Sequence, residues 1–202
     1  MTDIVKILAD ELGINISQVE ATVKLIDEGN TIPFISRYRK EVTGSLNDEI
    51  LRQFDERLKY LRNLEEKKAQ VLCAVKEQGK LTDELRRDIE AACTLVAVDD
   101  LYRPFRPKRR TRAMIAIEKG LENFAVDIYE EKLQRPAIEE GEKYLSNKEG
   151  LEVEIPQDAI AGAMDIIAEK ISDDAAFRNK IRDLSFKQGI LTSVAKDETT
   201  ES

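Results

Sequence analysis

The chain contains no histidine, no tryptophan and only two cysteines among its 202 residues. Without histidine it cannot form a Ser-His-Asp triad, a Cys-His pair or a His-ligated metal centre. Gly29, Gly44 and Gly79 are single helix terminators, and the sequence contains no glycine-rich phosphate-binding loop. Asp99 and Asp100 are the nearest approach to a catalytic pair, and we expect them to pair with the adjacent arginines. The sequence therefore predicts no enzyme activity, no cofactor and no metal.

The two cysteines, Cys73 and Cys93, lie far apart in segments rich in alanine and valine. A thiol in such a segment usually acts as a small buried hydrophobe, and a disulfide is not expected in a reducing compartment. No run of about 18 apolar residues is present, and the acidic start of the chain does not resemble a signal peptide. We therefore expect a cytoplasmic protein with no membrane association.

Aromatic residues make up only 5% of the chain, whereas charged residues make up 36%. The core must then consist mainly of leucine, isoleucine, valine and alanine, which favours helices over a β-sandwich. Apolar residues recur at intervals of three and four along most of the sequence, as on one face of an α-helix. The predicted fold class is all-α.

Residues 1–46 are predicted to form a small N-terminal bundle of three short helices. The first two end at Gly13 and Gly29, and the third starts near Pro33 and runs to about residue 41. A helix-turn-helix arrangement is one interpretation of this bundle.

Residues 47–79 are predicted to form a single long connecting helix. Asn47 is a good N-cap, and no proline or glycine follows until Gly79. Its apolar seam is interrupted by Glu65 and Lys68, so we expect the middle of this helix to be exposed and only its two ends to be buried.

Residues 80–195 are predicted to form a larger helical body that packs at the far end of the connecting helix. An amphipathic helix starts at Pro156, with Ala163, Met164 and Ile167 on its apolar face, and a last helix is capped by Asp173. A loop is expected over residues 149–154. Residues 196–202 are predicted to be a disordered tail.

One segment concentrates positive charge. Residues 103–112 carry six arginines and lysines and no acid, and since the whole chain has a net charge of −8, the remaining residues carry −14. Such an asymmetry is typical of a phosphate-facing patch, and two prolines stiffen the segment. The candidate contacts to nucleic acid are Arg106, Lys108, Arg109, Arg110 and Arg112. The alternative is that these side chains pair with acids of the same protein or contact another protein domain, and for Arg103 we favour an internal ion pair.

A second candidate is the run Arg37, Arg39 and Lys40. On a helix, Phe34 and Tyr38 share one face, so the segment can bury its aromatic rings and expose its charge. Structural packing with a modest contribution to phosphate binding is the favoured interpretation.

The segments 27–44 and 99–116, together with 56–61, 78–82 and 171–191, resemble the N-terminal region of the Tex family of bacterial transcription accessory proteins. The resemblance implies association with RNA and with the transcription machinery. It also implies that the RNase-H-like, helix-hairpin-helix and C-terminal RNA-binding domains of the family are missing from this sequence. The expected function is a non-catalytic scaffold with weak, auxiliary RNA contacts. The alternative is a module that docks RNA polymerase or the other domains of its own chain.

Overall fold

The computed structural model describes residues 4–107 and 109–194. Its regular structure over these residues is helical, as the composition predicts, with turns and loops between the helices, and its one extended feature there is an isolated bridge between Ser146 and Val153. The chain divides into two compact units, Met1–Asp99 and Asp100–Ser202. Our division at residues 46, 79 and 195 stays a prediction. Lys108 and the tail at residues 196–202, which we predict to be disordered, lie outside the described residues.

The first unit is organised along α4 (Asp48–Glu77). Asn47 caps this helix by accepting a hydrogen bond from the Ile50 amide at 2.8 Å, and Asp48 and Glu49 occupy the first turn, where negative charge is favourable. Thirty residues at 1.5 Å each give a length of about 45 Å. The predicted long helix is confirmed, with its end one residue before Gln78.

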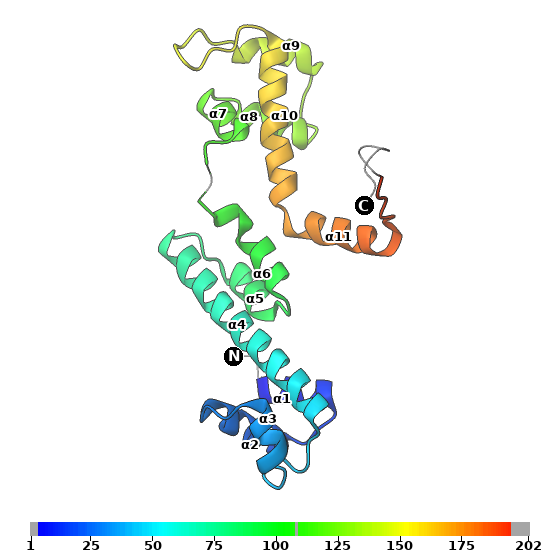
Figure 1. Cartoon of the computed structure of the whole chain (residues 1–202). Coiled ribbons are helices and arrows are strands. Elements are labelled where there is room, and N and C mark those ends of the chain that lie inside the picture. Colours follow the sequence, from blue (N-terminus) through cyan, green and yellow to red (C-terminus); the bar gives the residue numbers. More distant parts are fainter. Residues whose placement is uncertain (1–3, 108, 195–202) are drawn as a thin grey trace. The chain divides into compact units, whose positions relative to one another are not determined.

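Two apolar clusters cover the N-terminal half of α4. The first joins it to α1 (Ile4–Leu12) and α2 (Ile16–Asp27), and the second joins it to α2 and α3 (Ile32–Tyr38). Figure 1 shows these three helices gathered at the N-terminal end of α4. The fully buried side chains of these clusters are Leu8, Val19, Ile35, Leu51 and Phe54. Helix α3 ends at Tyr38, earlier than predicted, and a turn closes the bundle before Asn47.

The middle of α4 is buried, so our expectation of an exposed middle is wrong. Leu64 lies in the interior, and Lys68 is only 4% exposed. The Lys68 ammonium donates one hydrogen bond to Glu65 at 2.9 Å and another, also at 2.9 Å, to the carbonyl of Glu90 in α5 (Asp83–Ala91). Carbonyls in the last turn of a helix have no partner within the helix. The buried charge thus satisfies the end of α5 and fastens it to α4.

Two bidentate ion pairs and one hydroxyl add polar contacts to α4. Arg57 donates to both oxygens of Glu11 and Arg62 to both oxygens of Asp27. Tyr60 accepts a hydrogen bond from the amide of Leu95, where α6 (Leu95–Tyr102) begins. The ion pairs are largely exposed and therefore contribute little to stability. The burial of apolar side chains is the main stabilising contribution in this unit.

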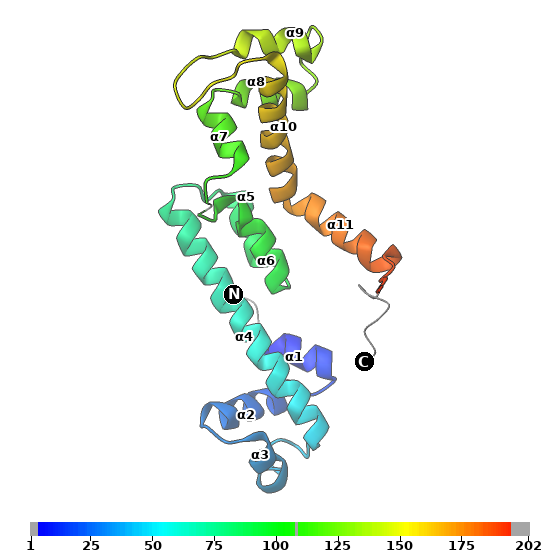
Figure 2. The same ribbon diagram turned by 45° about the horizontal axis from the view of Figure 1, so that its top comes forward.

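In the second unit, α10 (Pro156–Asp173) lies against α7 (Arg112–Glu118), α8 (Glu122–Tyr129) and α9 (Ala137–Gly141), as both views show (Figures 1 and 2). Short 3-10 helices follow α6 and α9, over Arg103–Phe105 and Glu142–Tyr144. The last helix is α11 (Ala175–Gln188), capped by Asp174 and not by Asp173 as predicted. Pro156 starts α10 as predicted, and residues 149–154 contain no helix.

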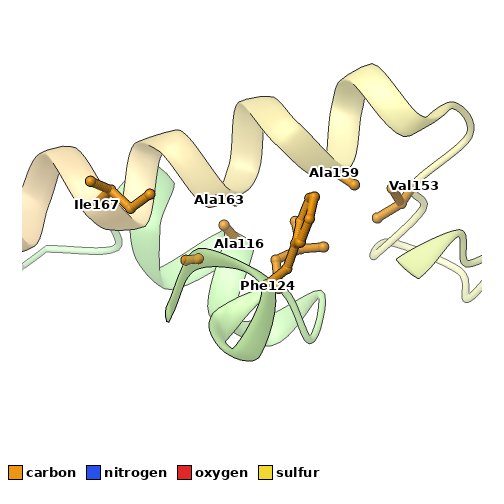
Figure 3. Packing of buried hydrophobic residues seen from close by; sticks show 8 residues of the cluster. Ala116, Phe124, Val153, Ala159, Ala163 and Ile167 are labelled. Atoms are coloured by element: carbon orange, nitrogen blue, oxygen red, sulfur yellow. The ribbon is translucent and has the colours of Figure 1, made fainter. Parts of the chain in front are cut away.

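Small side chains set the packing of α10. Its buried positions are Ala159, Ala163 and Ile167, whereas Met164, which we expected on the apolar face, is 53% exposed. A Cβ on Gly162 would lie 2.4 Å from Leu121 Cδ1 and 3.3 Å from Ala116 Cβ. Figure 3 shows how Ala116, Phe124 and Val153 converge on this face. Small residues are needed there because the neighbouring helices approach closely.

Truncation of the α4 seam should cost much stability. Leu58 is 2% exposed, and we expect Leu58→Ala to lower the free energy of unfolding by about 2–5 kcal/mol through lost burial and a residual cavity. Glu56→Ala, at an exposed position of the same helix, should change it by less than about 0.5 kcal/mol. Urea denaturation of both variants measures the difference. Similarly small effects of the two substitutions would contradict the burial of Leu58 in the apolar face of α4.

Glu65 should contribute more to the free energy of unfolding than its partly exposed position suggests. Glu65→Ala removes an acceptor from buried Lys68, so we expect a loss of about 1–3 kcal/mol in the free energy of unfolding. Glu66→Ala is the matched control, because Glu66 is exposed and lies one residue along the same helix. Equal stabilities of the two variants would mean that Lys68 does not need this carboxylate.

Candidate nucleic-acid interface

The basic segment begins in the 3-10 helix and runs to the start of α7. Arg103 pairs with Asp173 at 2.9 Å, which confirms the internal ion pair favoured for this residue. The Arg106 guanidinium lies 5.5 Å from the centroid of the Tyr102 ring, a distance suited to a cation–π contact. The first two arginines of the segment are therefore held by the protein itself.

The next cations point outward. Arg109, Arg110 and Arg112 are all exposed, and Lys108 is outside the described residues. Arg110 pairs with Glu118 at 2.5 Å, but this pair is exposed on both sides and is therefore easily exchanged for a phosphate. Over the described part of the chain, Arg109 and Arg112 make no ion pair. Positive charge thus stays available along residues 109–112.

Thr111 fixes this part of the segment. Its hydroxyl oxygen accepts from the Met114 amide at 3.1 Å as the N-cap of α7, and it donates to Glu169 of α10 at 2.8 Å. The backbone on either side is thereby tied to the core of the second unit. A pocket of about 350 Å³ lies beside it, lined by Arg103, Arg106, Pro107, Thr111, Glu169, Ser172 and Asp173. Its two carboxylates make it a poor site for an isolated anion.

The second candidate belongs to the first unit, at α3 and the turn that follows. Arg37 lies in the last turn of α3, and Arg39 and Lys40 follow the helix. All three are exposed, and none forms an ion pair with any residue in the described ranges. The expectation that Phe34 and Tyr38 are packed inward is wrong: they are 36% and 66% exposed. The aliphatic Ile35, and not the aromatic pair, anchors α3 to the core.

The turn after α3 is held from α2. The Gln18 side-chain amide donates hydrogen bonds to the carbonyls of Thr43 and Gly44 at 3.1 and 3.2 Å, and its Oε1 accepts from the Asn15 backbone amide at 3.1 Å. Gly44 has φ +63°, and a Cβ there would lie 2.6 Å from Gln18 Nε2. Thr43 is fully buried and donates back to the carbonyl of Arg39 at 3.2 Å. The basic residues therefore stand on an ordered turn.

Two other expectations need correction. Cys73 and Cys93 are exposed, and Cys73 Sγ donates to Glu77 at 3.4 Å. That hydrogen bond and the negative charge of Glu77 raise the pKa of the Cys73 thiol. Asp100 pairs with Arg178 and Arg182 of α11 at 2.6 and 2.5 Å, and not with the neighbouring arginines.

Sequence reasoning missed the exposed apolar surface of α11. No side chain of this helix is buried. Phe177, Ile181 and Leu184 are spaced by four and three residues and are exposed, as are Phe186, Ile190, Leu191 and Val194. Where α10 and α11 meet, a pocket of about 570 Å³ is lined by Ala168, Ile171, Ser172, Arg178, Ile181 and Arg182. The helical spacing was visible in the sequence, but spacing alone does not tell a covered face from an uncovered one.

Residues 4–107 and 109–194 contain no helix that is both long and apolar enough to cross a membrane. They also contain no group of three or more cysteine, aspartate or glutamate side chains arranged to hold a metal ion. The two exposed basic surfaces, at residues 109–112 and at Arg37, Arg39 and Lys40, are therefore the main candidate functional features of the described residues.

Comparison with known proteins identifies the family that this chain resembles. Residues 2–76 match the model of the Tex-like protein N-terminal domain. The chain is 44% identical over 201 residues to the transcriptional accessory protein Tex of Neisseria gonorrhoeae and 43% identical over 188 residues to protein YhgF of Escherichia coli. These alignments cover 98% and 93% of this chain, but only 26% and 24% of the relatives. The human S1 RNA-binding domain-containing protein 1 is 27% identical over 96% of this chain and 19% of its own length.

The chain belongs to the Tex family. It spans about a quarter of the length of the bacterial relatives named above, and the family-model match lies in its N-terminal part. The resemblance inferred from residues 27–44 and 99–116 is thereby confirmed.

The ion triplet at Asp100 should be sensitive to acid. Burial raises the pKa of Asp100, but hydrogen bonds from Arg178 and Arg182 outweigh burial, so its pKa lies below the ordinary value of 3.8. A lowered pKa means that the carboxylate stabilises the fold above about pH 4 and loses this effect as the pH falls through the lowered value. We expect Asp100→Asn to cost about 1–3 kcal/mol at pH 7 and progressively less below pH 4.

Urea denaturation at pH 7, 5 and 3 measures the dependence. Asp183→Asn, at an exposed position of α11, is the control and should have little effect at any of these pH values. A difference between wild type and Asp100→Asn that persists unchanged at pH 3 would contradict the assignment.

Proposed function

We propose that the chain is a non-catalytic scaffold of a Tex-like transcription accessory protein and that it contributes auxiliary contacts to RNA. The observation that carries the proposal is the outward-facing charge of Arg109, Arg110 and Arg112 in a protein with a net charge of −8. Lys108, in the same run of sequence, adds to this charge. A concentrated cationic surface on an acidic protein attracts a polyanion locally while the rest of the surface repels it.

The chemistry of the segment suits phosphates better than bases. Arginine presents a planar fork of donors that matches phosphate oxygens. Thr111 holds the backbone, so that less conformational freedom is lost on binding. We infer that Arg106, which packs over Tyr102, takes a secondary part in phosphate binding. Such contacts would position an RNA strand without reading its sequence.

Further support comes from the relatives. One is named as a transcriptional accessory protein and another as an S1 RNA-binding domain-containing protein. On the same basis we propose that the protein acts in the cytoplasm with the transcription machinery. The non-catalytic role is supported by the lack of histidine and by the engagement of Asp100 with two arginines.

The N-terminal bundle contributes in a second place, through Arg37, Arg39 and Lys40. A helix-turn-helix reader places the N-terminal residues of its second helix in the major groove. Helix α3 has seven residues and carries its cations at and beyond its C-terminal end. This arrangement favours contact with a strand lying across the surface over insertion into a groove.

A second candidate function is docking of another protein domain, and the observation that favours it is α11. Its apolar side chains Phe177, Ile181 and Leu184 are exposed, and the pocket of about 570 Å³ beside them could accept apolar side chains. Apolar patches of this kind often mark interfaces. RNA polymerase or other domains of a Tex-like protein are the candidate partners.

The salt dependence of RNA binding tests the main proposal. The logarithm of the binding constant for single-stranded RNA should fall with the logarithm of salt concentration at a slope of about −2 to −3, as expected for three or four phosphate contacts. Replacing Arg109 and Arg110 together with alanine should flatten the slope by about one to two units and leave sequence preference unchanged.

The double variant of Arg86 and Arg87 is the matched control, because these two are also adjacent, exposed arginines, in α5. It should retain the wild-type slope. If the Arg109 and Arg110 double variant binds RNA like wild type but loses binding to purified RNA polymerase, docking is the function of this segment.

A further inference from the structure

We propose that the exposed aromatic pair at the end of α3 stacks on an unpaired base of single-stranded nucleic acid. The stacking surface consists of Phe34, Tyr38 and Arg39, with Arg37 and Lys40 beside it. The inference rests on the proposed contact with nucleic acid and adds to it a mode of binding, base stacking, that phosphate contacts do not supply.

The exposure of the rings is the first observation. Tyr38 is 66% exposed and Phe34 is 36% exposed, although the neighbouring Ile35 is completely buried. Aromatic side chains gain much from burial, and only 5% of this chain is aromatic. Helix α3 is fastened to the core by an aliphatic side chain, and its two rings are left together on the surface.

The arrangement of the rings decides where a base can lie. Their centroids are 5.2 Å apart at an interplanar angle of 45°, and the Arg39 guanidinium lies 5.2 Å from the Phe34 centroid. A base inserted between two rings would need roughly 7–8 Å, twice the usual contact distance of about 3.5–4 Å. A base therefore cannot lie between the two rings, and Tyr38, the more exposed of them, is the ring on which it stacks.

The charge around the rings is suited to the phosphates that flank such a base. Arg37, Arg39 and Lys40 form no ion pair within the described part of the chain, and Glu41 is the one acid in residues 29–47. This stretch therefore has a net charge of +2 in a chain of net charge −8. Exposed rings flanked by unpaired cations are the usual composition of surfaces that bind single strands.

The surface is also held in place. The hydrogen bonds from Gln18 to the carbonyls of Thr43 and Gly44, and the burial of Thr43, fix the turn that carries Arg39 and Lys40. An ordered surface loses little conformational entropy on binding. Tyrosine and arginine are also enriched in protein interfaces, so a protein partner is the rival that the experiment must exclude.

The test uses the absence of tryptophan from the chain. In Tyr38→Trp the new residue is the only tryptophan, and we expect its fluorescence to be quenched when an oligouridylate of about 12 nucleotides binds, because stacking on a base quenches indole emission. Tyr129→Trp is the matched control. Tyr129 is 40% exposed and has Lys170 4.3 Å from its ring centroid, so it is also an exposed ring beside a cation, and it should show no quenching.

Affinity provides the second measurement. Tyr38→Ala should bind the oligouridylate about 5- to 100-fold more weakly than wild type, whereas Tyr38→Phe, which keeps the ring, should bind within about threefold. An abasic strand of the same length should bind wild type and Tyr38→Ala equally. Because Tyr38 is mostly exposed, the midpoint of thermal unfolding should be unchanged and will verify that the variants are folded.

The outcomes separate this inference from the proposed function. Wild-type affinity in Tyr38→Ala, or quenching at position 129 equal to that at position 38, would overturn base stacking even if the Arg109 and Arg110 variant still changes the salt slope. Loss of binding to purified RNA polymerase in Tyr38→Ala, with RNA binding intact, would likewise overturn it in favour of a protein partner. Lack of any binding of wild type to the oligouridylate would reject the proposed function and this inference together.

Discussion

The burial of one continuous face of α4 is the constraint on which the first unit depends. Its buried positions run from Leu51 to Val75 at intervals of three and four residues without interruption. A helix of this length cannot keep such a face in water, so α1, α2 and α3 cover one part of it and α5 another. Lys68 is the single charged member of the face, and it is tolerated because Glu65 and the Glu90 carbonyl satisfy its ammonium group.

The two basic surfaces, at residues 109–112 and at the turn after α3, share one property: the backbone beneath each of them is held in place by packing and hydrogen bonds. In the second unit, close approach of α7 and α10 at Gly162 places Thr111 where it can both cap α7 and bond Glu169. In the first unit, Gln18 fixes the turn after α3. In both places a polar side chain other than the candidate cations, Thr111 or Gln18, holds the backbone. Arg109 and Arg112 in the second unit, and Arg37 and Lys40 in the first, are consequently exposed on an ordered backbone.

Much of the architecture follows from local features of the sequence. Asn47 and the lack of glycine or proline up to Gly79 determine the long helix, because capping and helix propensity act within a few residues. The start of α10 at Pro156 and the irregular stretch at 149–154 have the same local origin. The charge of residues 103–112 is likewise a property of the chain before it folds, as is the family resemblance.

What the sequence by itself determined is therefore the helices, their approximate limits and the location of charge; the tertiary structure alone decided which faces are covered. Periodicity gives a helix an apolar side, but a short helix such as α3 can be anchored by Ile35 with Tyr38 left outside, and α10 buries Ala159 in preference to Met164. The Glu90 carbonyl that binds Lys68 is 22 residues away from it, and the two arginines that bind Asp100 are 78 and 82 residues away. Contacts at such separations depend on how close two helices approach, and this distance is set by the side chains of both helices and not by the pattern of either one.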